Sequence, residues 1–432
     1  MESLALMPSY EAYKDSGVEW LGDIPASWSL LANKHIFRLK KKQVGKRSNE
    51  YDLLSLTLRG VIKRDMENPE GKFPAEFDTY QEVRCGDFIF CLFDVEETPR
   101  TVGLSPFNGM ITGAYTVFEP NDNFDNRFLY YFYLNLDAKK RLKPLYRGLR
   151  NTIPKDSFLS FKTFVPPHEQ QTLIANFLDK KTAQIDDAIA IKEQQISLLK
   201  ERKQIIIQQA VTQGLDPNVP MKDSGVDWIG KIPQHWKLKP NKCLFKLKKS
   251  LVGKRSGDYE LLSLTLKGII KRDMDNPEGK FPAEFNTYQE VSVGDFVFCL
   301  FDVEETPRTV GLSKFRGMIT GAYTVFELDE SVSKEFLYYF YLNLDSRKMM
   351  RPLYKGLRNT ISKETFLSFK SFIPPLKEQE EIVDFIEYEV NKIDLTIDGI
   401  SEQIDKIKEY KSCLINGSVT GKIKVTSEMV EQ

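Results

Sequence analysis

The chain contains the same sequence unit twice, and this internal repeat restricts its possible folds more than any other feature. With a shift of 208 residues and no gap, segment 15–22 (DSGVEWLG) falls on segment 223–230 (DSGVDWIG). Between Tyr51 and Phe118, 58 of 68 positions are identical to those between Tyr259 and Phe326. Because the period is too long for a solenoid, each unit is predicted to be a domain with its own connector.

Each repeat changes character at its paired prolines. The first part contains short apolar runs, such as DFIFCLFDV and ITGAYTVFE, that turn residues interrupt, which indicates a mixed, largely β domain with small helices. After Pro166 and Pro167 there is no glycine or proline until Gly214, which favours one long helix. The predicted fold class is α+β, with two such domains separated by two long helices.

Both expected helices carry residues spaced alternately four and three apart, as in the seam of a coiled coil. The apolar members of this seam are Leu178, Ile185, Ile189, Ile196, Leu199 and Ile206 in the first helix, and Ile386, Val390, Ile393, Ile397, Ile400, Ile404, Ile407 and Leu414 in the second. One such stripe would suit a helix packed on its own domain, whereas two matched stripes favour pairing of the helices. We expect an antiparallel pair and an internal pseudo-twofold axis. At about 1.5 Å per residue, each helix would be a spacer of about 60 Å.

These patterns together predict the organisation of the chain. It consists of a first domain over 1–167, a first helix over 168–213, a linker over 214–221, a second domain over 222–375, a second helix over 376–421 and a C-terminal tail over 422–432.

The charges of the chain balance, with 61 basic and 61 acidic side chains, so any DNA-binding surface must be local. Arginine can bond guanine bidentately, asparagine can bond adenine, and both basic residue types neutralise phosphates. Side chains of these types recur at equal positions in the two repeats, and the same residues could equally form structural ion pairs. The candidate DNA contacts are Lys46, Arg47, Lys63, Arg64, Arg100, Arg150 and Asn151, with Lys254, Arg255, Lys271, Arg272, Arg308, Arg358 and Asn359 in the second copy.

Signals for catalysis or metal binding are few. The sequence has no GxxxxGK[ST] phosphate loop, no HExxH motif and no CxxC pair, and none of its three histidines recurs in both repeats. We therefore expect no catalytic residues and no metal site. No apolar run is long enough to span a membrane and no secretory signal is evident, so a cytoplasmic location is expected.

One repeated pattern leaves a nuclease interpretation open. Asp65, Glu70 and Lys72 recur 208 residues later as a second D-x4-E-x-K arrangement, which could hold Mg²⁺ between carboxylates. The surrounding segment MENPEGKFP has the composition of a proline- and glycine-containing loop, so a surface loop is the preferred interpretation.

Several repeated segments resemble the specificity subunits of type I restriction-modification systems. They are KDSGVEWLGDIPASW and KDSGVDWIGKIPQHW before the domains, VPPHEQQ and IPPLKEQEEI at the helix starts, and AVTQG and SVTGK at the helix ends. The first helix start departs from the pattern, with His168-Glu169-Gln170-Gln171 where Leu-x-Glu-Gln is expected. The resemblance covers essentially the whole chain.

This resemblance implies a non-catalytic subunit with two target-recognition domains, similar in fold to the recognition domains of DNA adenine methyltransferases. It implies double-stranded DNA, two modification (methyltransferase) subunits and restriction (translocase/endonuclease) subunits as partners. S-adenosylmethionine, ATP and Mg²⁺ would then bind to the partner subunits and not to this chain. The near-identity of the repeats further predicts a bipartite target that is an interrupted palindrome. The alternatives are a coiled-coil scaffold that bridges two proteins without DNA contact and, less favoured, the Mg²⁺-dependent nuclease.

Overall fold

The computed structural model describes residues 7–19, 21–65, 76–226, 229–273 and 285–431. The chain forms two compact units, of which the first comprises residues 1–192 and 402–432 and the second residues 193–401. Each unit combines one mixed helix-and-strand domain with part of both long helices, α3 (His168–Gln213) and α6 (Leu376–Val419). The α+β fold class expected from the sequence is confirmed. The compact units, however, divide the two helices and do not end where the helices begin.

Apart from one short helix near the end of the chain, the remaining elements of the two units correspond one to one. In the first unit they are β1 (Tyr13–Asp15), β2 (Asp23–Pro25), β3 (Ser29–Ala32), β4 (Phe37–Lys40), β5 (Leu54–Thr57), β6 (Gly60–Lys63), β7 (Gln81–Val83), β8 (Phe88–Phe90), β9 (Val102–Leu104), β10 (Gly109–Ile111), β11 (Thr116–Pro120), α1 (Asn126–Ala138), α2 (Lys155–Ser160) and β12 (Lys162–Val165), with α7 (Ser427–Glu431) at the chain end. In the second unit they are β13 (Met221–Asp223), β14 (Lys231–Pro233), β15 (Lys237–Pro240), β16 (Phe245–Leu247), β17 (Leu262–Thr265), β18 (Gly268–Lys271), β19 (Gln289–Val291), β20 (Phe296–Phe298), β21 (Val310–Leu312), β22 (Gly317–Ile319), β23 (Thr324–Leu328), α4 (Lys334–Ser346), α5 (Lys363–Ser368) and β24 (Lys370–Ile373).

A four-stranded antiparallel sheet, in the order β4-β11-β8-β9, lies at the centre of the first domain. Phe118 of β11 pairs with Phe88 of β8, and the next pair is Val117 with Ile89. Because successive strand residues point to opposite faces, the phenylalanines enter the main core while Val117 and Ile89 enter a smaller cluster behind the sheet. The sheet is therefore buried on both faces. The second unit repeats this order with β16-β23-β20-β21.

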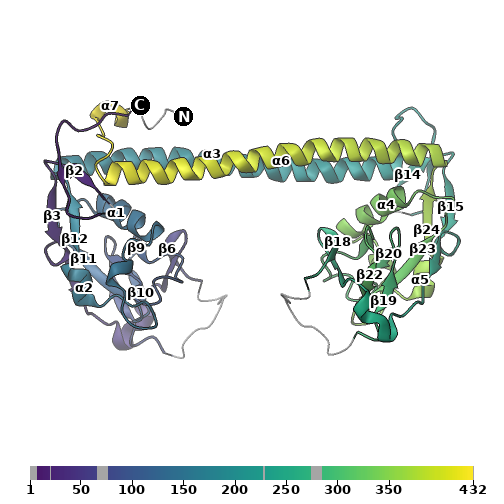
Figure 1. The fold of residues 1–432 in the computed structure, drawn as a ribbon, viewed down its shortest axis with the longest axis horizontal. Helices are drawn as coiled ribbons and strands as arrows, with labels where there is room; N and C mark the ends of the chain where they lie inside the picture. The colour runs from purple at the N-terminus through teal and green to yellow at the C-terminus, as the bar shows by residue number, and fades with distance from the viewer. Residues whose placement is uncertain (1–6, 20, 66–75, 227–228, 274–284, 432) are drawn as a thin grey trace. The chain divides into compact units, whose positions relative to one another are not determined.

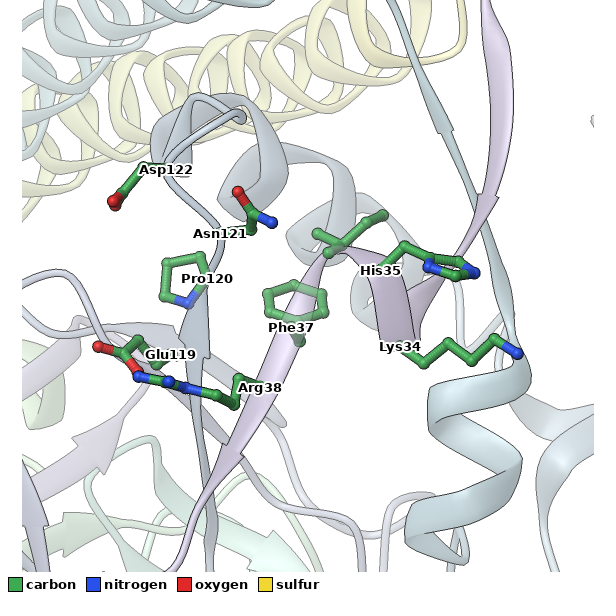
Figure 2. A pocket seen from close by; sticks show the side chains of 9 residues that line it. Lys34, His35, Phe37, Arg38, Glu119, Pro120, Asn121 and Asp122 are labelled. Carbon is green, nitrogen blue, oxygen red and sulfur yellow. The ribbon is translucent and has the colours of Figure 1, made fainter.

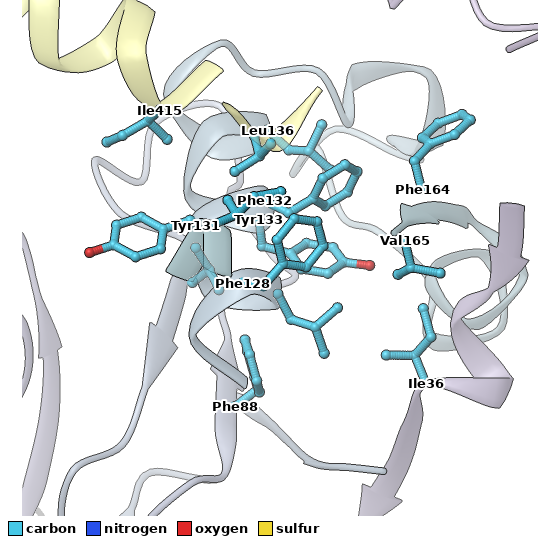
Figure 3. Packing of buried hydrophobic residues seen from close by; sticks show 14 of the residues in the cluster. Ile36, Phe88, Phe128, Tyr131, Phe132, Tyr133, Leu136, Phe164, Val165 and Ile415 are labelled. Carbon is cyan, nitrogen blue, oxygen red and sulfur yellow. The ribbon is translucent and has the colours of Figure 1, made fainter. Parts of the chain in front are cut away.

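Helix α1 covers the main core and carries much of its aromatic content (Figure 3). Asp125 caps the helix by accepting hydrogen bonds from the backbone N–H groups of Arg127 and Phe128. Tyr133, fully buried, donates from its hydroxyl to Asn33 Oδ1 at 2.7 Å and lies 2.6 Å from Thr163 Oγ1. Burial raises the pKa of the Tyr133 hydroxyl, so this group stays protonated and able to donate.

The glutamine at the fourth position after the paired prolines, Gln171 or Gln379, ties each long helix to its domain. Gln171 donates to the Pro166 carbonyl at 2.9 Å and accepts from the Asp125 backbone N–H at 3.0 Å. Gln379 does the same in the second unit, with Pro374 at 2.8 Å and Ser333 at 2.8 Å. The first helix begins at His168 despite the departure of its motif from the family pattern, because this glutamine is retained.

The two long helices run side by side and antiparallel within each unit (Figure 1). In the first unit, Lys411 donates to Asp186 at 2.7 Å and Lys192 donates to Gln403 at 2.6 Å. As the residue number increases along α3, the number of its partner in α6 decreases, which is the pattern of an antiparallel pair. In the second unit, Lys203 bonds Asp394 at 2.8 Å. All the residues of the expected seam are buried or half-buried along both helices. Leu414 and Ile415 of α6 also enter the core of the first domain.

Within the ranges that the structure describes, no helix is both long enough and apolar enough to cross a membrane.

Candidate nucleic-acid interface

The first basic pair of each repeat lies on an exposed 3₁₀ helix, η3 (Gly45–Glu50) in the first unit and η6 (Gly253–Asp258) in the second. The chain enters η3 through Gly45, whose φ of 58° is in the left-handed region that favours glycine. Lys46 and Arg47 are exposed and form no ion pair with any other described residue, and Lys254 and Arg255 are equivalent to them. These side chains are therefore accessible to a ligand, although the Arg255 guanidinium lies 5.8 Å from the centre of the Tyr259 ring.

The second basic pair, Lys63 and Arg64, lies at the open end of the β5–β6 hairpin. Lys63 lies opposite Leu54, and the backbone N–H of Arg64 donates to the Leu53 carbonyl at 2.8 Å. Lys63 Nζ lies 2.6 Å from a carboxylate oxygen of Asp52 and 5.3 Å from the centre of the Phe107 ring. The equivalent Lys271 lies 3.6 Å from the Glu260 carboxylate. These lysines are exposed but already partly neutralised.

The two basic pairs belong to one continuous structure in each unit. The chain passes from η3 through a short connection into β5, turns back in β6, and reaches the second pair at the end of that strand. Lys46 and Arg47 are therefore joined to Lys63 and Arg64 by the hairpin, although the two pairs are well separated in the sequence. A two-stranded antiparallel ribbon of this kind is one of the elements that can enter the major groove of DNA.

The tip of the hairpin carries two exposed residues that the sequence analysis did not single out, Leu58 and Arg59. Thr57 stabilises this tight turn, since its Oγ1 accepts from the Arg59 backbone N–H at 3.2 Å and donates to the Gly60 carbonyl at 3.0 Å. Leu58 is 65% exposed, as is Leu266 in the second unit. The sequence does contain a pattern that predicts this tip. Two apolar runs of strand length are separated by a short interruption that ends in glycine, which is typical of a β-hairpin.

Arg100 braces this tip from the side. Its guanidinium donates to the Leu58 carbonyl at 2.9 Å and to the Tyr130 hydroxyl of α1 at 3.2 Å. Arg308 donates equivalently to the Leu266 carbonyl at 3.1 Å. Both arginines thus position the hairpin on its domain, and only the remaining hydrogen-bonding capacity of each is available to DNA.

Arg150 and Asn151 lie on a different loop and are engaged with carboxylates. The Arg150 guanidinium binds both carboxylate oxygens of Asp94 and lies 5.5 Å from the centre of the Phe93 ring. This pairing lowers the pKa of Asp94. Asn151 Nδ2 lies 3.5 Å from Glu97 Oε1. Arg358 and Asn359 repeat these contacts with Asp302 and Glu305, so contact with a base would require these pairs to open.

The carboxylates considered for a metal site are only partly described. Asp65 and Asp273 are exposed, whereas Glu70, Lys72, Glu278 and Lys280 lie outside the described residues. Among the described residues there is no group of three or more histidine, cysteine or acidic side chains that could hold a metal ion.

A pocket of about 320 Å³ opens beside β4 and β11, away from the hairpin residues. Figure 2 shows that Lys34 and His35 are directed away from Glu119 and Asp122. Arg38 forms an ion pair with Glu119 and lowers the pKa of that carboxyl group. The titratable groups of the pocket therefore do not converge on one point, and the pocket does not have the geometry of an acid–base site.

Comparison with known proteins finds similarity to one described domain in both repeats. The family model described as "Type I restriction modification DNA specificity domain" matches residues 102–201 and 310–406, two ranges that begin at equivalent positions of the repeat. A solved structure from work on complex assembly and conformational transition of the type I R-M system has a TM-score of 0.65 and 11% identity, with 92% of this chain and 98% of that chain covered. The HsdS subunit from Thermoanaerobacter tengcongensis has a TM-score of 0.49 and 13% identity, with 93% and 98% covered.

Both repeats thus contain a region that matches the type I restriction modification DNA specificity domain. The resemblance of the repeated segments is thereby confirmed. This match favours neither the scaffold nor the nuclease alternative.

Proposed function

We propose that this chain is the DNA-sequence-recognition subunit of a type I restriction-modification complex and reads its target with two domains. The observation that carries the proposal is the repeat itself: both copies match the specificity-domain model, and each copy also has an exposed basic pair that precedes a braced β-hairpin in the chain. The bases would be read by side chains at the hairpin, while Lys46 and Arg47 would contact phosphates. The second copy would use Lys254 and Arg255 in the same way.

The target is proposed to be an interrupted palindrome. Two like domains that each read one strand of a duplex encounter the same bases in inverted order, because the strands are related by a twofold axis. The two domains are not identical at every exposed position. Pro106 of the first domain corresponds to Lys314 of the second, and Asn108 corresponds to Arg316. Lys314 lines a hollow beside the second hairpin together with Lys271. If the half-sites differ, the difference should therefore be at a base near this hollow.

Two modification subunits and the restriction subunits are the proposed protein partners. In this scheme the partners hold S-adenosylmethionine, ATP and Mg²⁺, and they methylate adenine or cleave DNA at positions that this chain selects. The basic pairs and the hairpins supply hydrogen bonds and positive charge, which is what selection of a sequence requires.

Single-molecule sequencing of host DNA, with and without the gene, tests the proposal. The expected result is loss of adenine methylation at one bipartite motif when the gene is removed. Methylation that does not depend on the gene would contradict the function, and a motif with two unrelated halves would contradict the palindrome alone.

A further inference from the structure

The hollow beside the hairpin of the second domain has a volume of about 820 Å³ and a basic lining. The β17–β18 hairpin, the turn between β21 and β22, and the first residue of α4 each contribute lysine side chains to it. The four lysines are Lys267, Lys271, Lys314 and Lys334. Because cations from separate elements meet around one concavity, their fields add, and the hollow attracts an anionic ligand.

Lys334 is the first residue of α4 and lies against the turn between β19 and β20. Its Nζ is 2.5 Å from the point at which a side chain on Gly294 would begin, so the glycine leaves room for the ammonium group. The cap of the helix is the uncharged hydroxyl of Ser333, which accepts from the Phe336 backbone N–H. The partial positive charge of the helix N-terminus therefore adds to the charge of Lys334.

Most of the positive charge in the hollow is not paired. Three of the lysines are exposed and form no ion pair with another described residue, namely Lys267, Lys314 and Lys334. Two carboxylates, Glu335 and Glu387, also line the hollow. Burial, followed by the negative charges of Glu387 and Glu335, raises the pKa of Tyr339 to about 12, which places both carboxylates near that side chain. With four lysines and two carboxylates in the lining, the hollow is positively charged overall.

The first domain lacks two of these cations. Pro106 and Asn126 stand at the positions of Lys314 and Lys334 in the second domain. Its helix α1 is capped by a carboxylate, Asp125, where α4 has a hydroxyl. The neighbouring Arg127 is a cation, but it pairs with Asp125 at 3.0 Å and also with a second carboxylate on α3 at 2.9 Å. The two domains therefore differ in charge at this place, although their folds match.

We propose that this hollow binds one phosphate of the DNA backbone beside the second half-site, with Lys334 as its main ligand, and that the first domain makes no equivalent contact. This inference rests on the proposed function for the nature of the ligand. A base edge lies inside a groove and is reached by a protruding element such as the hairpin, whereas a concave cationic surface suits the protruding backbone. Lysine binds a phosphate as a point charge, without a fixed bidentate geometry. The two domains consequently bind their half-sites with unequal strength.

The test measures binding of the assembled methyltransferase to a duplex that carries the sequenced target, by fluorescence anisotropy at several salt concentrations. Lys334→Asn gives the second domain the residue of the first. It should reduce the slope of log K against log salt concentration by about 0.9, the contribution of one phosphate, or about 3.5-fold in relative affinity over a fourfold change in salt concentration. Lys334→Arg keeps the cation and should keep the slope. The methylated motif should not change in either variant, because a phosphate contact carries no sequence information.

The matched control is Asn126→Ala, which changes the same position of the first domain and should leave the slope as in the wild type. Unaltered thermal unfolding shows that the variants are folded. A wild-type slope in Lys334→Asn, or an equal reduction in the control, would overturn the inference. A changed base in the second half-site would also overturn it, because Lys334 would then read a base. If the wild-type complex itself does not bind the duplex, the proposed function is wrong instead.

Discussion

The exposed basic pairs make a quantitative prediction about the salt dependence of DNA binding. Lys46 and Arg47 have no carboxylate partner among the described residues, and neither do Lys254 and Arg255. We consider replacement of the first pair by glutamine, and then of both pairs. Glutamine removes the positive charge and keeps a polar side chain that can still donate a hydrogen bond.

The magnitude follows from counterion release. Each phosphate that a cation neutralises contributes about 0.9 to the slope of log K against log salt concentration. Loss of one pair should therefore reduce the slope by about 1.8, and loss of both pairs by about 3.6. Over a fourfold change in salt concentration, these differences correspond to about 12-fold and about 150-fold in relative affinity.

The assay is fluorescence anisotropy of the assembled methyltransferase on a duplex with the mapped target, over a range of salt concentrations. The control combines Lys377→Gln with Lys406→Gln on α6, which removes two charges from side chains that already pair with Glu381 and Glu402. The control should keep the wild-type slope. A wild-type slope in the variant that lacks both basic pairs would refute the assignment of these residues to the DNA interface.

Three further predictions concern activity, the helices and the core. The purified chain alone should show no methyltransferase or nuclease turnover. It should support methylation once the modification subunit and S-adenosylmethionine are added. Turnover by the chain alone would contradict its assignment. Deletion of one heptad from each helix (189–195 and 397–403) keeps the seam in phase and shortens each helix by about 10 Å. Methylome sequencing should then show a shorter spacer between the half-sites, or no modification. An unchanged spacer would mean that the helices do not set the spacing. Tyr133→Phe removes a buried hydroxyl and should lower the free energy of unfolding of the first unit by about 1–2 kcal/mol in urea titrations, whereas an unaltered midpoint would show that the bond to Asn33 contributes nothing.

The long helices could be predicted from the sequence because their signals are local and periodic. Paired prolines mark each start, and the seam repeats over many turns, so the expected first range, 168–213, is that of α3. The division of both helices between two compact units was not predictable in the same way. It depends on contacts such as those of Leu414 and Ile415 with the first domain, whose other core residues lie mostly in the first half of the sequence.

The candidate interface was only partly predictable, because a sequence shows which residues are basic but not which carboxylates they meet. Lys46 and Arg47 prove to be exposed without an ion pair among the described residues, whereas Arg150 binds Asp94, 56 positions earlier. Nothing local to either arginine distinguishes these environments. The repeat shows that a position is retained, and retention is equally expected of a DNA contact and of a structural ion pair.

The internal repeat also provides a physical comparison within one molecule. Where both copies keep a residue and its contacts, as for Arg100 and Arg308 at the hairpins, the shared role is to position the same backbone. Where the copies differ in charge at an exposed site, as for Pro106 and Lys314, the fold tolerates both residues, so the exchange is free to change what the domain binds. Base specificity should therefore be sought first among exposed residues that differ between otherwise matched surfaces, and the effect of Lys314→Pro on the second half-site would show whether this exchange alters the bases read.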